Sequence, residues 1–223
     1  MRTEPLDWQR IAVDAGVEVV WHAETGSTND DARNFALSGA ADGTVVIADA
    51  QRYGRGRRGA EWVSPPQRNL LCSVVLRPGL PVEKWARLTH ACALAVCEAL
   101  EVLPDLPPPQ IKWPNDVFLR GRKVSGILVE SALDARGGFA VAGVGVNLNL
   151  TSEDFPVELR NSATSVWLER GGQPVSREDF AVHFLQRLQG QCDRAREDFR
   201  SLLADCNSRS FLNGQRVTMV SGG

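Results

Sequence analysis

The segment QIKWPNDVFLRGRKVSGILVE, residues 110–130, decides the fold class. It contains three apolar runs, QIKW, VFL and VSGILVE, which are separated by PND and RGR. Short apolar runs bounded by Pro, Asn, Asp and Gly are typical of β-strands joined by tight turns. The segment therefore predicts a meander of three strands.

Further strands and helices alternate irregularly on both sides of this meander. Apolar residues at helical spacing predict a long helix over residues 83–103, and a second one behind Ser176 with an apolar face that extends to Leu202. A shorter helix is expected over residues 28–38, and strands are expected at residues 17–21, 44–49, 70–76 and 139–150. Because helices and strands do not alternate regularly, we expect an α+β fold with a mixed β-sheet flanked by helices.

The composition is that of an ordinary globular chain. Its 223 residues correspond to about one and a half average domains, and the apolar share of 43% allows a buried core without disulfides or metals. A net charge of −2 excludes a protein that binds polyanions with its whole surface. No apolar run has the length of a membrane span, and the N-terminus lacks the apolar core of a signal peptide.

The cysteines indicate a reducing compartment. The five of them, at positions 72, 92, 97, 192 and 206, are odd in number and form no CxxC pair. We therefore expect reduced, mostly buried thiols in a cytoplasmic protein. With only three histidines in the chain, a zinc site is not expected.

The most conspicuous local motif is GRGRRG at residues 54–59. It lies in a segment, residues 51–68, that shows no periodicity and is long for a structureless loop, which is typical of functional loops. Its glycines allow backbone N–H groups to approach an anion, and its arginines supply charge. The motif is neither a Walker A loop nor a dinucleotide fingerprint. A solvated basic loop or a contact to nucleic acid remains the alternative.

Two lysines in the meander form a second candidate site. Of the 25 basic residues only three are lysines, at positions 84, 112 and 123. Lys is a compact point charge, so its use in an arginine-rich chain suggests that an ammonium is needed. We expect Lys112 and Lys123 to lie on neighbouring strands, to point to the same face and to bind a phosphate or carboxylate. The alternative is that PND is merely a hairpin turn and the lysines are solvated.

Taken in order, these segments resemble one family. GSTN (26–29), GRGRRG followed by Trp62 and SP, KWPNDV (112–117), GRKVSGILVE (121–130) and GVGVNLN (143–149) are similar to the biotin protein ligases, the biotin–[carboxylase carrier] ligases. The resemblance covers roughly residues 20–170. Lipoate ligases and octanoyl transferases share the fold of this family but lack the combination of GRGRRG with KWPND and GRKxxGIL.

The resemblance implies a biotin-lipoate ligase catalytic domain with a sheet like that of class II aminoacyl-tRNA synthetases. It implies a reaction in two steps: biotin and ATP give biotinyl-5′-AMP and pyrophosphate, and biotin then passes to a lysine of a carrier protein. ATP is expected with Mg²⁺ held mainly by its phosphates, so no protein ligand is assigned to the metal.

The resemblance also assigns the site residues. Those expected to act in catalysis are Arg57, Lys112, Asp116 and Lys123. Those expected to bind biotin or the adenylate are Ser27, Thr28, Asn29, Gln51, Gly54, Arg55, Gly56, Arg57, Trp62, Lys123 and Gly126. Those expected at the nucleotide are Asn115, Asn147, Ala163, Thr164 and Ser165. Each has an ordinary structural alternative: a helix cap for residues 27–29, core packing for Trp62, and strand packing for Gly143 and Gly145.

Domain organisation and partners follow from the same resemblance. We expect a catalytic domain over residues 1–210, with residues 211–223 as the first strand of a truncated or missing SH3-like domain. Only about sixteen residues precede the first strand, so a monofunctional enzyme without a DNA-binding domain is expected. The expected acceptor is the biotin carboxyl carrier protein of acetyl-CoA carboxylase. We expect no specific DNA binding and no membrane association, and the resemblance allows a homodimer.

Two other functions stay open on the sequence alone. A lipoate- or octanoyl-type acyl transferase would use the same fold. A nucleic-acid-binding module would use the arginine-glycine loop, but the basic cluster is short, aromatic residues make up only 7% of the chain and the overall charge is acidic.

Overall fold

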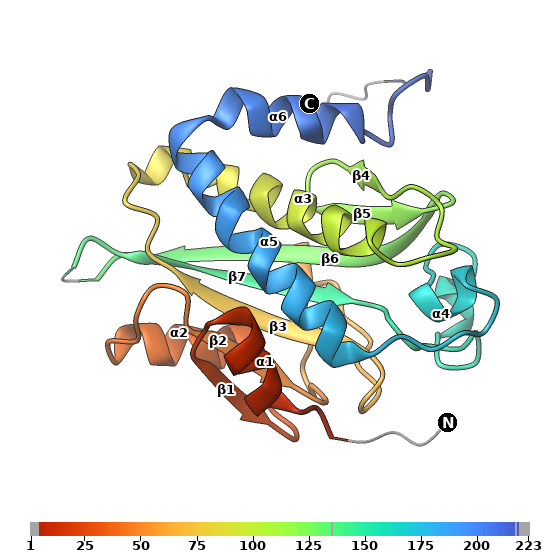
Figure 1. The fold of residues 1–223 in the computed structure, drawn as a ribbon, viewed down its shortest axis with the longest axis horizontal. Coiled ribbons are helices and arrows are strands. Elements are labelled where there is room, and N and C mark those ends of the chain that lie inside the picture. Colours follow the sequence, from red (N-terminus) through yellow and green to blue (C-terminus); the bar gives the residue numbers. More distant parts are fainter. Residues whose placement is uncertain (1–4, 135, 217, 219–223) are drawn as a thin grey trace.

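A seven-stranded mixed sheet forms the centre of the computed structural model, which describes residues 5–134, 136–216 and 218 (Figure 1). The strand order is β1-β2-β3-β7-β6-β5-β4. Strands β1 and β2 are parallel, and all other neighbours are antiparallel. The strands are β1 (Val19–His22), β2 (Val45–Ala48), β3 (Leu70–Leu76), β4 (Gln110–Lys112), β5 (Asp116–Leu119), β6 (Arg122–Ala132) and β7 (Phe139–Val146).

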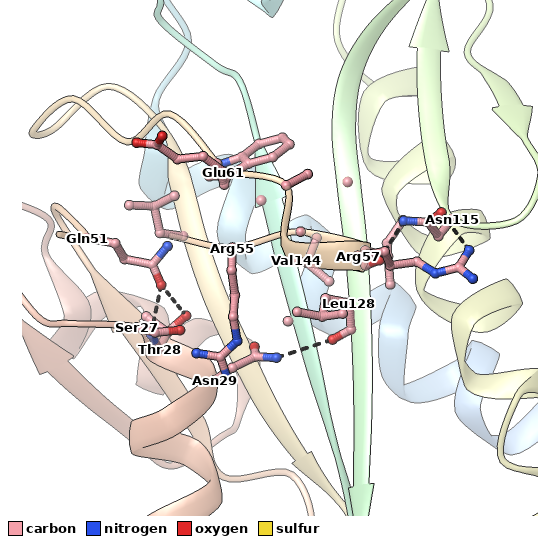
Figure 2. A pocket seen from close by; sticks show the side chains of 18 of the residues that line it. Ser27, Thr28, Asn29, Gln51, Arg55, Arg57, Glu61, Asn115, Leu128 and Val144 are labelled. Carbon is pink, nitrogen blue, oxygen red and sulfur yellow. Dashed lines mark hydrogen bonds between the residues drawn. The ribbon is translucent and has the colours of Figure 1, made fainter. Parts of the chain in front are cut away.

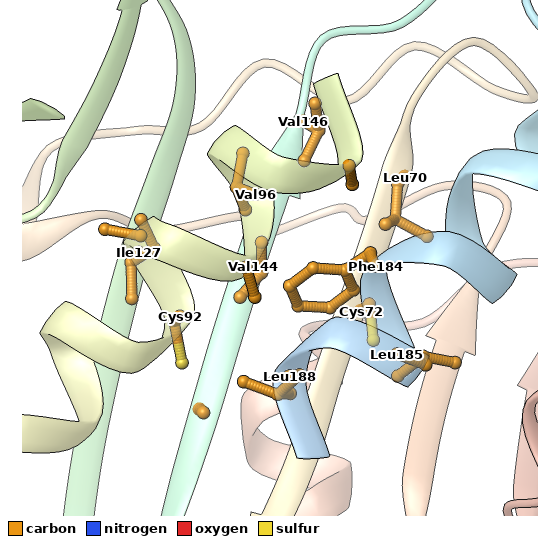
Figure 3. Close-up of a cluster of buried hydrophobic side chains, with 14 of the residues drawn as sticks. Leu70, Cys72, Cys92, Val96, Ile127, Val144, Val146, Phe184, Leu185 and Leu188 are labelled. Carbon is orange, nitrogen blue, oxygen red and sulfur yellow. The ribbon is translucent and has the colours of Figure 1, made fainter. Parts of the chain in front are cut away.

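Most helices cover one face of this sheet. They are α1 (Trp8–Ala15), α3 (Arg87–Glu101), α5 (Arg177–Glu197) and, packed against α3 and α5, α6 (Phe199–Ser208). Figure 3 shows how the main core forms: Phe184 of α5 and Cys92 of α3 lie over Cys72 of β3, Val144 of β7 and Ile127 of β6. All five of these side chains are almost completely buried, and burial of apolar area is the main stabilising contribution to such a fold.

The other face of the sheet is only partly covered. Helix α2 (Thr28–Leu37) packs on β2, β3 and β7, where Ala32 and Ala36 meet Val46, Val75 and Val141 in a second, smaller apolar cluster. Next to the N-terminal end of α2, the parts of β5, β6 and β7 on this face line a cavity. The face that carries α2 therefore has room for a site.

The sequence located all seven strands, and the predicted meander is formed by β4, β5 and β6. It missed α1, which begins after the N-cap Asp7 and ends at Gly16 in a left-handed conformation, and the short helix α4 (Val166–Glu169). The first predicted long helix begins later than expected, after a separate 3-10 turn at Val82–Lys84. The second is interrupted at Asp198, which adopts non-helical backbone angles and whose side chain caps α6 by accepting from Ser201 N.

The strand predicted within residues 211–223, QRVTMV, lies partly outside the described residues and stays a prediction. Residues 211–214 form turns and residues 215–216 have no regular structure, while residues 217 and 219–223 lie outside the described part. Just before them, Ser210 forms a parallel bridge with Ile111 of β4. The division of the chain into two domains stays a prediction.

All five cysteines are free and buried, as expected from the sequence. Burial raises the pKa of the Cys72 thiol to about 12, so this thiol is protonated at neutral pH. None of the helices in the described ranges combines the length and the apolar character needed to cross a bilayer.

A buried ion pair joins three parts of the fold. Arg177, the first residue of α5, donates from Nη1 to Asp49 Oδ1 at 2.7 Å, and both side chains are less than a tenth exposed. Leu6 N donates to the other carboxylate oxygen of Asp49 at 3.4 Å. Asp49 directly follows β2, so the pair fixes the end of that strand to α5 and to the N-terminal segment.

We predict that Arg177→Ala lowers the free energy of unfolding by about 3–5 kcal/mol, because it leaves the Asp49 carboxylate buried without its partner. Arg196→Ala is the matched control, since it removes an exposed pair with Asp193 (3.1 Å) and is expected to cost less than about 1 kcal/mol. Urea unfolding followed by circular dichroism measures both. Equal losses in the two variants would contradict the structural role of the buried pair.

Candidate active site

A cavity of about 270 Å³ opens on the face of the sheet that carries α2 (Figure 2). Its walls come from the first turn of α2, the loop that follows β2, and the facing parts of β5, β6 and β7. The sequence-predicted residues that line it are Ser27, Thr28, Asn29, Gln51, Arg55, Gly56, Arg57, Trp62, Asn115, Asp116, Lys123 and Gly126. Motifs that lie far apart in the sequence therefore meet in one space.

A chain of hydrogen bonds between neutral side chains forms one side of the cavity. Gln51 Oε1 accepts from the backbone N of Thr28 at 2.7 Å and from its hydroxyl at 2.9 Å. The Ser73 hydroxyl lies 2.7 Å from both Thr28 Oγ1 and Asn29 Oδ1. Ser27 occupies the N-cap position of α2, yet its side chain makes no capping bond, so it is not explained as a helix cap.

Glycines on β6 and β7 allow these groups to approach the sheet. A Cβ at Gly143 would lie 2.0 Å from Asn29 Oδ1, and a Cβ at Gly145 would lie 2.5 Å from the Trp62 indole. At Gly126 the indole and the Lys123 side chain would be 3.0 and 3.2 Å away. The strand-packing interpretation of these glycines is correct, and what packs on them is the side chains of the site.

The arginine-glycine loop contains a small hairpin and is not structureless. Trp62 N donates to Gly54 O at 2.9 Å, and Arg55 and Glu61 form an antiparallel bridge. A 3-10 turn at Arg57–Gly59 closes it. Gly54 does not line the cavity: a Cβ there would lie 2.6 Å from Trp62 O, so its glycine is required for packing inside the hairpin.

Two cations, Arg57 and Lys123, line the cavity. Arg57 Nη1 donates to Asn115 Oδ1 at 3.2 Å, and no ion pair among the described residues includes Arg57. Lys123 Nζ lies 2.7 Å from Asp116 Oδ1 and 5.5 Å from the centre of a Trp62 ring. An ammonium has three donors, so Lys123 keeps donors for a ligand after pairing with Asp116.

Arg55, a third cation on the cavity wall, is paired with two carboxylates. Its guanidinium binds both carboxylate oxygens of Asp30, at 2.6 and 2.7 Å, and Glu130 Oε2 at 3.1 Å. The hydrogen bonds from Arg55 hold the pKa of Asp30 below its ordinary value. Arg55 lines the cavity, and three of its five N–H donors bind carboxylates of the protein.

Lys112 does not lie in the cavity, contrary to the expectation from the sequence. It does share a sheet face with Lys123, but β5 separates their strands. Lys112 Nζ lies 4.9 Å from the ring centre of Phe118 and 5.9 Å from that of Phe211. The predicted pair of neighbouring lysines is therefore wrong, because the meander places a full strand between them.

Four residues assigned to the nucleotide do not line the cavity: Asn147, Ala163, Thr164 and Ser165. They lie next to the strand segment that contains Lys123. Ala163 pairs with Lys123 in a parallel bridge, and Asn147 Nδ2 donates to Thr164 O at 3.0 Å. Ser165 Oγ accepts from Leu168 N, so it caps α4. These residues brace the strand that carries Lys123, and their direct contact with a nucleotide stays a prediction.

The hydrogen bonds around Lys123 include a buried carboxylate, that of Glu169. Glu169, at the end of α4, accepts from Thr164 Oγ1 and from Arg122 Nη2, each at 2.7 Å. Arg122 directly precedes Lys123 on β6. The backbone at Lys123 is thus held on both sides.

Sequence reasoning missed Glu61, which lines the cavity, and three polar residues that bind to its walls: Ser73, Asp30 and Glu130. Ser73 is the one polar residue in the buried run LLCSVVL, which is a signal that the sequence does carry. Asp30 lies in the first turn of α2, where the helix dipole favours a carboxylate, and Glu130 lies within β6. No local pattern announces that these two carboxylates share one arginine.

No cluster of three His, Cys, Asp or Glu side chains suited to a metal is found among residues 5–134 and 136–216. Any magnesium that accompanies a nucleotide here is therefore expected to take most of its ligands from phosphate and water.

Comparison with known proteins gives a consistent result. The family model for the biotin/lipoate A/B protein ligase family matches residues 22–147. The biotin–[acetyl-CoA-carboxylase] ligase of Mycobacterium tuberculosis is 39% identical over 199 residues, which is 87% of this chain and 71% of the relative. The bifunctional ligase/repressor BirA of Bacillus subtilis is 36% identical over 76% of this chain, and the chain spans about half of that relative's length (52%).

A solved structure is similar as well. The biotin protein ligase from Aquifex aeolicus in complex with biotin and ATP superposes with a TM-score of 0.76 at 29% sequence identity, covering 87% of this chain and 78% of that one. The Leishmania major enzyme in complex with biotinyl-5-AMP superposes with a TM-score of 0.72 over 92% of this chain and 86% of that one; at 23% identity it supports the fold alone.

We predict that Gly145→Ala lowers the free energy of unfolding by about 1–3 kcal/mol, because the new Cβ forces the Trp62 indole or the strand to move. Gly190→Ala, on α5, is the matched control: nothing lies within 4 Å of its added Cβ, so it is expected to be neutral or stabilising. Urea unfolding of both variants tests this. A Gly145→Ala protein as stable as the parent would show that the indole is free to leave the strand.

Proposed function

Because the chain belongs to the biotin/lipoate A/B protein ligase family, we propose that it is a biotin–protein ligase. It activates biotin with ATP to biotinyl-5′-AMP and then transfers biotin to a lysine of a biotin carboxyl carrier protein. The observation that carries the proposal is that a neutral hydrogen-bonding wall and two cations, Arg57 and Lys123, line the same cavity.

Biotin fits the two kinds of wall in this cavity. Its ureido ring is neutral and polar, so it needs hydroxyl and amide partners, which Ser27, Thr28 and Asn29 supply. The rest of the molecule is apolar and would lie against Leu71. The carboxylate at its other end would then extend toward the cations.

Adenylate formation requires two anions to meet. The biotin carboxylate oxygen attacks the α-phosphate of ATP, a P–O bond forms, and pyrophosphate leaves. Two unit charges about 4 Å apart repel by roughly 4 kcal/mol at an effective dielectric near 20. Arg57 and Lys123 offset this repulsion and stabilise the charge that develops, because both are held in place before the reaction. The hairpin that carries Arg57 also keeps water from the anhydride.

The second step transfers biotin to an amine. The carrier lysine attacks the anhydride carbonyl, the C–N bond forms, and AMP leaves. Because a free lysine has a pKa near 10.4, it must lose a proton to react. We propose that Asp116 orients Lys123 in the first step through their 2.7 Å contact and accepts from, or orients, the incoming amine in the second.

The setting of this activity is part of the proposal. Five buried free thiols support a cytoplasmic location. Acetyl-CoA carboxylase is the expected source of the acceptor, by analogy with the relatives named for it. The resemblance allows a homodimer and implies no specific DNA binding, and sedimentation with and without biotin tests the oligomeric state.

Pyrophosphate release from ATP tests the activity. Release should require biotin and should yield bound biotinyl-5′-AMP when no carrier is present; one carrier lysine should gain biotin when it is added. Stabilisation by lipoate and ATP in place of biotin and ATP would indicate an acyl transferase on the same fold. A salt-sensitive shift of random DNA or RNA at micromolar protein would favour a nucleic-acid-binding module.

We predict that Lys123→Arg lowers the rate of adenylation at least about tenfold, roughly 1.4 kcal/mol, because a planar guanidinium cannot replace a point charge. Lys84→Arg, at an exposed position, is the matched control and should act like the parent. Single-turnover pyrophosphate release measures both. A fully active Lys123→Arg variant would contradict this role and would support the alternative that Lys123 is a solvated strand residue.

We predict that Arg57→Gly folds normally but releases the adenylate, because the charge that faces its phosphate is lost. The released intermediate should biotinylate lysines of bystander proteins. Arg58→Gly is the matched control in the same exposed turn, where Arg58 already has a positive φ of 57° that glycine adopts easily. Adenylate retained as tightly in Arg57→Gly as in the parent would remove the role given to Arg57.

A further inference from the structure

One side chain of the hairpin over the cavity bridges two other elements of the protein, in addition to the bond that Arg57 makes to Asn115. Arg55 reaches from the hairpin to Asp30 on α2, with both carboxylate oxygens engaged, and to Glu130 on β6. Two parallel N–H···O bonds to one carboxylate fix the plane of the guanidinium as well as its position. The attachment therefore specifies where the hairpin lies, in addition to holding it near the cavity.

Glu130 connects this attachment to the polar side of the cavity. The same oxygen, Oε2, accepts from Arg55 and, at 2.7 Å, from Asn29 Nδ2. Since Asn29 donates with its nitrogen to Glu130, its oxygen faces the Ser73 hydroxyl. Glu130 thus contacts both the hairpin, through Arg55, and an amide that lines the cavity, that of Asn29; Figure 2 shows these two side chains next to each other.

The attachment is also one that can open. Arg55 and Asp30 are 35% and 55% exposed, and exposed ion pairs are weakened by water and salt. Asp30 lies in the first turn of α2, where the helix dipole favours a carboxylate in either state of the hairpin. A pair of this kind holds a lid closed for part of the time and still lets a ligand enter.

We propose that Arg55, Asp30 and Glu130 form a latch that holds the hairpin of residues 54–62 closed over the cavity. Arg55 is then a positioning residue: it places Arg57 at the cavity, and it does not itself need to touch substrate. That the latch retains biotinyl-5′-AMP rests on the proposed function, whereas closure of the hairpin does not.

Limited digestion with trypsin tests closure in the free protein. The hairpin exposes the bonds after Arg57 and Arg58, and mass spectrometry separates cleavage there from cleavage after Arg187 on α5, which reports global unfolding. Asp30→Asn and Glu130→Gln should speed cleavage in the hairpin about threefold or more, with no change after Arg187. Glu24→Gln is the matched control, because it removes the exposed pair with Arg52 (3.3 Å) just before the hairpin.

The effects of salt and of exchanging the charges of Arg55 and Asp30 on the rate of hairpin cleavage distinguish an ion-pair latch from a purely structural role. High salt should speed hairpin cleavage in the parent but have little effect in Asp30→Asn. Combining Arg55→Asp with Asp30→Arg should slow cleavage again relative to Arg55→Asp alone. If trypsin cleaves the hairpin of Asp30→Asn and of Glu130→Gln at the parent rate, the latch is overturned. It is also overturned if cleavage after Arg187 is accelerated as much as cleavage in the hairpin.

The catalytic consequence is measured separately. If the protein is a biotin ligase, Asp30→Asn and Glu130→Gln should raise the KM for biotin and the rate of adenylate dissociation more than they lower kcat. If biotin and ATP give no pyrophosphate with the parent, the proposed function fails, while the trypsin result still decides whether the latch exists. If the hairpin is open in these variants but the rate of adenylate dissociation is unchanged, the latch does not retain biotinyl-5′-AMP.

Discussion

The site exists because three positions on one face of the sheet carry no side chain. Any Cβ at Gly143 or Gly145 would collide with Asn29 or Trp62, and one at Gly126 would crowd Trp62. Steric exclusion at these points therefore controls how closely the first turn of α2 and the hairpin approach the strands. The absence of side chains at these glycines lets Asn29 and Trp62 approach the strands closely enough to form the site.

The two faces of the sheet are used for different purposes, and the alternation of strand side chains separates them. On β3, Cys72 faces the helical core while Ser73, its neighbour in sequence, faces Thr28 and Asn29. On β7, Val144 and Val146 pack in the core and alternate with Gly143 and Gly145, which face the site. A rigid apolar layer thus lies directly beneath the polar site, which keeps the positions of its groups well defined.

Local chemistry in the sequence predicted the strands, the fold class and most residues of the cavity, because turns and apolar runs are local signals. It failed where the answer depends on distant pairs. Lys112 was misplaced because the order of strands, and not their sequence spacing, decides which side chains are neighbours. The ion pairs of Arg55 could not be predicted because nothing near it in sequence indicates Asp30 or Glu130. Helix α1 was missed although Asp7 and Gly16 bracket it with ordinary cap residues.

The buried thiols have a consequence for handling the protein. Cys72, Cys92 and Cys192 come from β3, α3 and α5 and lie together in the main core, where burial raises the pKa of each thiol. In the native state they are shielded from oxidants and alkylating agents. Once the helical layer separates from the sheet they become reactive, and air oxidation would then trap chains with mismatched disulfides. Thermal inactivation is thus expected to be reversible only under reducing conditions, and the rate of thiol labelling reports how often the core opens.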